Sequence, residues 1–268
     1  MVNVTTSATG RGSSARRACP SSPRILTLAV LAGGLMAMSA PAAAQIPDTF
    51  ENLQVLPEDI SREELTGIMR GFALALGVRC QYCHPGNGGQ GLQGIDFKSD
   101  EDPDKGKARF MMRMVAMLND STLPKLPDRD RPSLNVQCVT CHHGLSRPIT
   151  LAAELTQTLD RFGTEAAVAR YHELREQYYG SGAYDFGAIS LNELGRALAQ
   201  SGRSAEAITM LELNAEQYPE DVTAAVSLGQ LYARAGDREK AIASFERALR
   251  IQPDNRLARQ ALQRLRGG

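Results

Sequence analysis

The sequence predicts an all-α protein, and three observations support this. The chain of 268 residues has no tryptophan and only 5% aromatic residues, which disfavours sandwiches and barrels of aromatic-rich strands. Alanine, leucine, arginine and glutamate are abundant, and these residues favour helices. The last third repeats itself with a period of 34 residues, which is typical of a stacked helix pair. With 43% hydrophobic residues, the chain can bury the core of one or two domains.

Residues 1–44 have the pattern of an export signal that is cleaved after about Ala44. Basic residues precede an apolar run over residues 25–38, and small residues follow it up to the cleavage site. A transmembrane anchor is the less favoured alternative, because the run is shorter than the roughly 18 to 20 residues that a spanning helix needs. We therefore expect a periplasmic protein.

The charge pattern argues against a nucleic-acid partner. Without the leader, 26 basic residues face 30 acidic ones, and the two kinds alternate along the chain. A phosphate-binding surface would need a clustered basic face. Most of these charges are therefore expected on solvated helix surfaces.

Two C-x-x-C-H motifs, at residues 80–84 and 138–142, point to haem. In such a motif the two thiols add to the two vinyl groups of haem, and the histidine binds the iron. The fifth cysteine, Cys19, lies in the leader, so no cysteine is left for a structural disulfide. We predict two covalently attached haem c groups, held by these thiols and proximal histidines: Cys80, Cys83 and His84 for the first, and Cys138, Cys141 and His142 for the second.

Two other readings of the motifs remain open at this point. Two C-x-x-C pairs can bind zinc, but the 54 residues between them exceed the usual spacing, and zinc would not require either histidine. The pairs could also form redox-active disulfides, but the β-α-β context of such proteins is absent. Haem accounts for all six residues.

A helix is expected before each motif. Ser61 is a suitable N-cap with Glu64 three residues later, and the first helix can run to Leu76 before Gly77 ends it. The second helix is expected over about residues 104–118. Its start is marked by Pro103, and Ser99 or Asp100 is the expected cap.

Residues 48–150 resemble the cytochrome subunit of photosynthetic reaction centres, and most closely its short, non-photosynthetic members. The resemblance is carried by six segments around the motifs: Asn52–Pro57, Ile68–Phe72, Leu76–Cys80, Asp96–Asp100, Arg113–Val115 with Leu118 and Asn119, and Val139–Gly144 with Pro148. It implies a helical c-type cytochrome domain over residues 45–150 with two haem-attachment motifs.

The resemblance also implies distal ligands, since the family's helices usually give a methionine to the far side of the iron. Met69 lies 15 residues before His84, a spacing that the family uses, and is our choice for the first haem. For the second haem we choose Met114, which matches the family's Arg-Met-Val segment, with Met112 and Met117 as alternatives. Core packing is the competing role for each of them, because methionine fills gaps well.

Two further histidines have minor expected roles. His143 follows the proximal His142 directly and so is poorly placed for the opposite face of the same haem. We expect it to bind a propionate or solvent. His172 lies in a charged helix beyond the haem domain and is expected at the surface.

The C-terminal part has the period of tetratricopeptide repeats. Two repeats are expected, over residues 188–221 and 222–254, followed by a capping helix over residues 255–266, so that the module covers residues 188–268. Two repeats alone rarely suffice, so residues 151–187 are expected to add a helical lead-in around Thr164–Tyr179. Such arrays bind peptides or proteins in a concave groove; a purely structural appendage is the alternative.

These predictions combine into a periplasmic dihaem cytochrome that transfers single electrons and is not an enzyme. The repeats would dock a protein redox partner associated with the membrane, and no small-molecule substrate is expected. Two alternatives remain. One is an assembly or scaffold subunit of a membrane redox complex, and the other is a dihaem peroxidase-like enzyme, which would need an open iron position and an acid-base residue.

Overall fold

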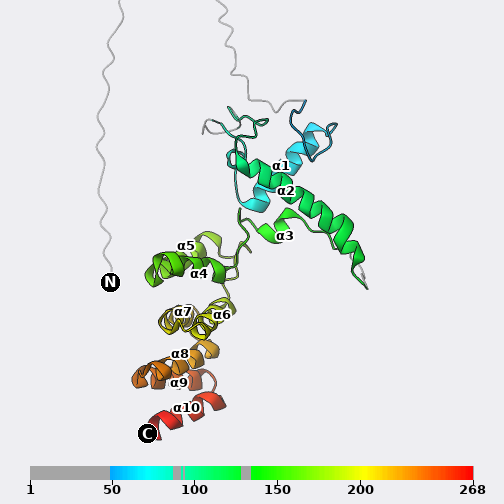
Figure 1. Cartoon of the computed structure of the whole chain (residues 1–268). Coiled ribbons are helices and arrows are strands. Elements are labelled where there is room, and N and C mark those ends of the chain that lie inside the picture. Colours follow the sequence, from blue (N-terminus) through cyan, green and yellow to red (C-terminus); the bar gives the residue numbers. More distant parts are fainter. Residues whose placement is uncertain (1–48, 87–91, 93, 128–133, 268) are drawn as a thin grey trace, which may run out of the picture. The chain divides into compact units, whose positions relative to one another are not determined.

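The computed structural model describes residues 49–86, 92, 94–127 and 134–267. Within these residues every regular element is a helix, and no β-strand occurs (Figure 1). The predicted all-α class is therefore confirmed. The export signal expected over residues 1–44 lies outside the described residues.

Helix α1 (Arg62–Leu76) begins and ends where its capping residues predict. The Glu64 backbone N–H donates to Ser61 Oγ at 3.2 Å, and Gly77 ends the helix in the left-handed conformation, with φ of 66°. The Val78 backbone N–H then reaches back to the Ala73 carbonyl at 3.0 Å, which closes the last turn. The chain leaves α1 directly into the first motif.

Helix α2 (Pro103–Met117) starts at Pro103 as expected, but its cap is Asp102. The Asp104 backbone N–H donates to Asp102 Oδ1 at 2.9 Å. Neither expected cap is available, because Ser99 Oγ accepts the Glu101 N–H and the Asp100 carboxylate pairs with side chains of α2. Beyond Met117 the chain continues as a π-helical turn, Leu118–Thr122, and a 3₁₀ turn, Leu123–Lys125.

Helix α3 (Cys138–His142) is a single turn that packs against α1. The approach is close, because the Gly144 N–H donates to the Ala75 carbonyl at 2.8 Å. Asn119 holds the segment before α3 with two bonds to Val136, one to its carbonyl and one from its N–H, both 2.8 Å. The second motif is thus tied both to the end of α1 and to the turn after α2.

Seven further helices form the C-terminal part. They are α4 (Leu151–Phe162), α5 (Thr164–Tyr178), α6 (Ala188–Gln200), α7 (Ser204–Gln217), α8 (Val222–Ala235), α9 (Arg238–Ile251) and α10 (Arg256–Gly267). They pack as three pairs in chain order, each pair contacts the next, and α10 covers the last pair. One buried apolar cluster runs from Leu151 to Leu262.

The lead-in to the repeats holds a helix pair rather than the single expected helix. The expected helix is α5, and α4 precedes it. Thr150 Oγ1 accepts the Ala153 N–H at 3.2 Å, which starts α4. Leu155 and its helical neighbours Leu151 and Leu159 are buried on one face, so α4 packs as the first helix of a third pair.

Two glycines let the helices of a pair approach closely. A Cβ at Gly229 would stand 2.7 to 2.8 Å from ring atoms of Phe245, which is itself buried. Gly195 has the same relation to Leu211 in the preceding pair. Both belong to the small-residue positions of the repeat pattern.

Replacing Gly229 with alanine should therefore lower the free energy of unfolding by about 2 kcal/mol, because the Phe245 ring must move within a packed core. Gly67→Ala in α1 is the matched control, since nothing lies within 4 Å of its added Cβ. The control should be neutral or stabilising by about 1 kcal/mol. Denaturant unfolding of both variants measures this, and equal effects would contradict the packing argument.

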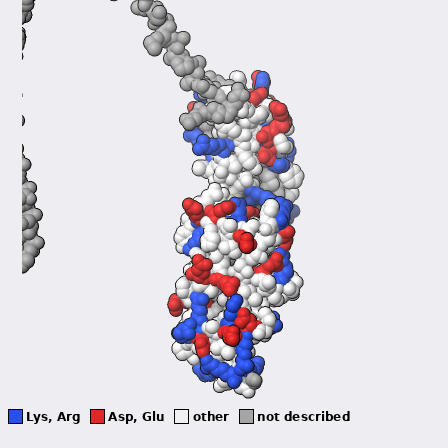
Figure 2. All heavy atoms as spheres, turned by 90° about the vertical axis from the view of Figure 1, so that its left-hand side faces the viewer, with Lys and Arg blue, Asp and Glu red and all other residues white. Residues whose placement is uncertain are grey.

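Charged residues of both signs are scattered among uncharged ones on the face shown in Figure 2, and the basic ones gather near the C-terminal end. Among the described residues, none of the helices is both long enough and apolar enough to cross a bilayer.

Candidate functional site

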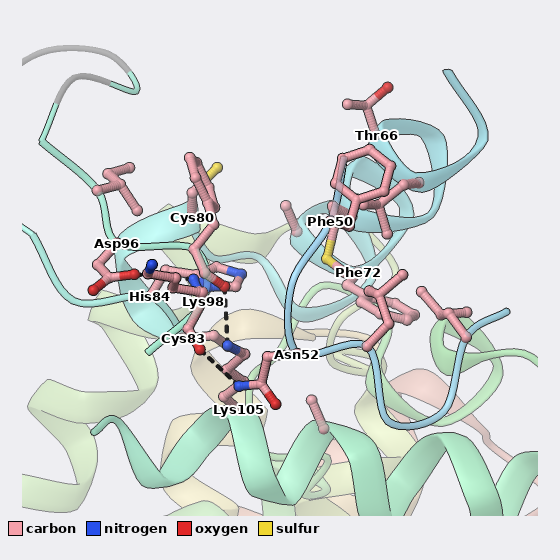
Figure 3. A pocket seen from close by; sticks show the side chains of 18 of the residues that line it. Phe50, Asn52, Thr66, Phe72, Cys80, Cys83, His84, Asp96, Lys98 and Lys105 are labelled. Atoms are coloured by element: carbon pink, nitrogen blue, oxygen red, sulfur yellow. Dashed lines mark hydrogen bonds between the residues drawn. The ribbon is translucent and has the colours of Figure 1, made fainter. Parts of the chain in front are cut away.

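A cavity of about 830 Å³ lies beside the first motif. Met69 of α1, the motif residues Cys80, Cys83 and His84, and residues of α2 all line it. In Figure 3, Cys80, Cys83 and His84 lie on one side of the cavity, Phe50, Thr66 and Phe72 on the other, and Lys105 between them. The structure therefore brings together all four residues predicted for the first haem.

The tight backbone of the first motif orients its three functional side chains. Residues Cys80–Tyr82 form a 3₁₀ turn, and the N–H groups of Cys83 and His84 both donate to the Cys80 carbonyl, at 3.3 and 3.1 Å. Both thiols and the imidazole therefore face one cavity.

This donor set fits haem c. The cavity volume lies within the roughly 300 to 1,000 Å³ typical of cofactor pockets, and its walls are mainly apolar. Two thiols, one imidazole and a thioether are the groups that covalent attachment and axial ligation use.

The environment of His84 favours the neutral imidazole that binds metals. Burial lowers the pKa of His84, and repulsion by Lys105 lowers it further. The Phe97 ring contacts the imidazole edge-on, with ring centroids 5.1 Å apart. Among the described residues, no hydrogen-bond partner faces the buried Nδ1 atom.

The second motif is arranged differently, as the helical turn α3. Cys138, Cys141 and His142 stand at positions i, i+3 and i+4, so they share one face. His142 is buried, and its Nδ1 lies 2.7 Å from the Leu145 carbonyl. A carbonyl at Nδ1 selects the tautomer that leaves Nε2 free for a metal.

Helix α2 presents different methionines on two opposite faces. Met112 lines the first cavity together with Lys105, Ala108 and Arg109, which lie on the same face. Met114 points elsewhere and is half-buried. Phe110 and Met117 lie about one turn before and after Met114, and their exposed fractions are 66% and 56%. This second face is an apolar surface with the methionine chosen for the second haem at its centre.

The sequence does not predict three residues of the first cavity: Met112, Lys105 and Arg109. Its pattern offers Met112 only as a ligand of the second haem and places the two cations on a solvated helix surface. The helical period would place all three on one face, but it does not tell which face meets the first motif.

The two remaining histidines, His143 and His172, both lie at the surface. His143 is exposed and adopts a left-handed conformation, with φ of 47°, at the end of α3. His172 is exposed, as expected, and its ring contacts that of Tyr171 edge-on, with ring centroids 5.6 Å apart.

Among the described residues, no group of three or more histidine, cysteine or acidic side chains lies close enough together to hold a metal ion directly. The four motif cysteines are not joined in disulfides.

Comparison with known proteins agrees with the two parts of the chain. Residues 34–165 match the family "Photosynthetic reaction centre cytochrome C subunit", and residues 192–256 match "Tetratricopeptide repeat". Cytochrome c-554 of Chloroflexus aurantiacus is 39% identical over 99 residues, which are 37% of this chain and 21% of that protein.

A second curated relative is the photosynthetic reaction center cytochrome c subunit of Rubrivivax gelatinosus, 34% identical over 102 residues. This match covers 34% of this chain and 26% of the relative. The chain thus spans only about a quarter of the length of the curated relatives it matches.

Among solved structures, the first tetratricopeptide domain of Spaghetti (RPAP3), bound to an HSP90 peptide, has a TM-score of 0.31 and 16% identity. The matched region covers 44% of this chain and 88% of the solved chain. Residues 34–165 of this chain are thus similar to the photosynthetic reaction centre cytochrome C subunit family, and residues 192–256 to tetratricopeptide repeats.

Proposed function

We propose that this chain is an exported electron-transfer protein that holds two haem c groups and accepts and releases single electrons. The single observation that carries this is the convergence of Met69, Cys80, Cys83 and His84 on one cavity. The match of residues 34–165 to the cytochrome family supports it independently.

In this proposal the first haem is attached through Cys80 and Cys83. His84 is its proximal ligand, and Met69 is its distal ligand. Bound haem c supplies one-electron redox chemistry. The chain's own residues hold the macrocycle covalently, exclude water with apolar walls, and keep the imidazole neutral.

The second haem is attached through Cys138 and Cys141, with His142 as proximal ligand and Met114 as distal ligand. Support comes from the His142 Nδ1 contact with the Leu145 carbonyl. Met114 lies on the face of α2 opposite to the one that lines the first cavity, and the exposed residues Phe110 and Met117 lie about one turn before and after it.

The repeat segment docks a protein redox partner at the membrane surface, and export to the periplasm places the chain there. Three stacked helix pairs with a capping helix support this role, because the stability of such arrays comes from neighbouring pairs and leaves one face for binding.

A pyridine haemochrome assay on the purified full chain tests the proposal. We expect two haems per chain, and one haem after Cys138 and Cys141 are both changed to serine. The matched double change of Cys80 and Cys83 should also leave one. Wild-type protein with fewer than two haems would contradict the proposal.

The same preparation separates electron transfer from catalysis. Two irons with complete axial ligation leave no position for an external ligand, so the reduced protein should not bind carbon monoxide readily and should not turn over peroxide. Rapid carbon monoxide binding or peroxide turnover would favour the peroxidase-like alternative.

A further inference from the structure

Two cations in the wall of the first cavity share one carboxylate. Lys105 and Arg109 both line the cavity, and their side chains are only 12% and 13% exposed. Asp100 lies 3.2 Å from Lys105 Nζ and 2.9 Å from Arg109 Nη1. In the described part of the chain, no other carboxylate forms an ion pair with either cation. The three side chains together therefore carry one positive charge in excess.

The Lys105 ammonium group is held in place by three acceptors. It donates to the carbonyls of Phe97, at 2.9 Å, and Ser99, at 2.8 Å, and it faces Asp100. An ammonium group has three protons, so all of them have partners. Its charge therefore stays at the cavity wall and does not move out into solvent.

The carboxylate of the cluster is ionised at neutral pH. Hydrogen bonds from Arg109, Asn52 and Lys105 hold the pKa of Asp100 well below its usual range. Asn52 Nδ2 donates to Asp100 Oδ1 at 2.9 Å, and Gln54 Nε2 donates to Asp100 Oδ2 at 3.2 Å. The Asp100 carboxylate therefore keeps its negative charge at neutral pH.

The cluster is close to the expected iron ligand. Lys105 is near enough to His84 to lower its pKa by repulsion, and Phe97, whose carbonyl accepts from Lys105, packs its ring against the imidazole. Figure 3 shows Lys105 below Cys83 and His84.

We propose that the cluster of Lys105, Arg109 and Asp100 raises the reduction potential of the haem held in the first cavity, an inference that rests on the proposed haem-binding function. Reduction adds one electron and makes the charge at the iron more negative by one. A fixed cation nearby stabilises this reduced form. Since the cations are nearly buried, solvent and salt screen them less than they screen surface charges.

Two substitutions with opposite expected signs test this. Lys105→Met removes a positive charge and should lower the potential of one haem. Asp100→Asn removes the negative charge and should raise it. Disrupted packing alone would not shift the potential in opposite directions. The potentials are measured on the full chain by titration with dithionite and ferricyanide, fitted with two haem components.

Two control variants define the role of charge. Lys107→Met makes the same change on the same helix, but Lys107 is exposed by 71%, so solvent screens its charge and any shift should be much smaller than that of Lys105→Met. Lys105→Arg keeps the charge and should restore the wild-type potential. If Lys105→Met does not accumulate, Asp100→Asn alone decides, because it removes no buried cation.

The outcomes separate this inference from the proposed function. Haem content is measured first in every variant. A wild-type chain without haem would overturn the proposed function and this inference together. Full haem content with potentials that do not move, or that move in the same direction in both variants, would overturn this inference alone.

Discussion

Replacing Met69 with alanine should lower the potential of one haem by on the order of 0.1 V, because axial ligands spread haem potentials over about 0.8 V and methionine raises them. The weak absorption of the methionine sulfur-to-iron bond should also disappear in the Met69→Ala variant. Met69 lies on α1, with its side chain in the wall of the cavity that His84 also lines. Redox titration and the spectrum of the oxidised protein measure both effects.

Met112→Ala is the matched control, since Met112 lines the same cavity from α2. Only one thioether can occupy the position opposite His84, so the control should keep the sulfur-to-iron absorption. If Met112→Ala removes that absorption and Met69→Ala does not, the distal ligand comes from α2. If neither does, methionine is not the ligand of this haem.

Gly77→Ala should cost about 3 kcal/mol of unfolding free energy, for two reasons that add together. Gly77 has φ of 66°, a conformation that alanine adopts with strain. An added Cβ would also stand 2.1 Å from the Gly144 carbonyl oxygen, which is backbone and cannot rotate away. The contact between the end of α1 and the second motif must therefore open.

Denaturant unfolding followed by haem absorbance measures this cost. Gly71→Ala in the same helix is the control, because nothing lies within 4 Å of its Cβ. Alanine is the better helix former, so the control should raise stability by about 1 kcal/mol. A Gly77 variant as stable as wild type would show that α1 and α3 are not coupled through this contact.

Local signals in the sequence predicted the helices because each signal acts within a few residues. Ser61 and Gly77 mark the ends of α1, and Pro103 marks the start of α2, since capping and proline geometry depend on adjacent backbone groups. The cap of α2 is Asp102 and not one of the predicted residues, because contacts distant in the sequence decide which side chain is available. Asp100 was a plausible cap from its position, but it is occupied by Lys105 and Arg109, whose side chains reach it only in the folded chain.

The same distinction applies to the candidate site. The sequence alone predicts the two haem-attachment motifs, because two thiols and a histidine that meet one macrocycle must be neighbours in the chain. It could not decide which face of α2 meets the first motif, since helical periodicity relates the side chains of one helix only to each other. Tertiary packing decided that Met112 and two cations line the first cavity while Met114 faces away, and it placed the cluster of Lys105, Arg109 and Asp100 beside the expected iron ligand.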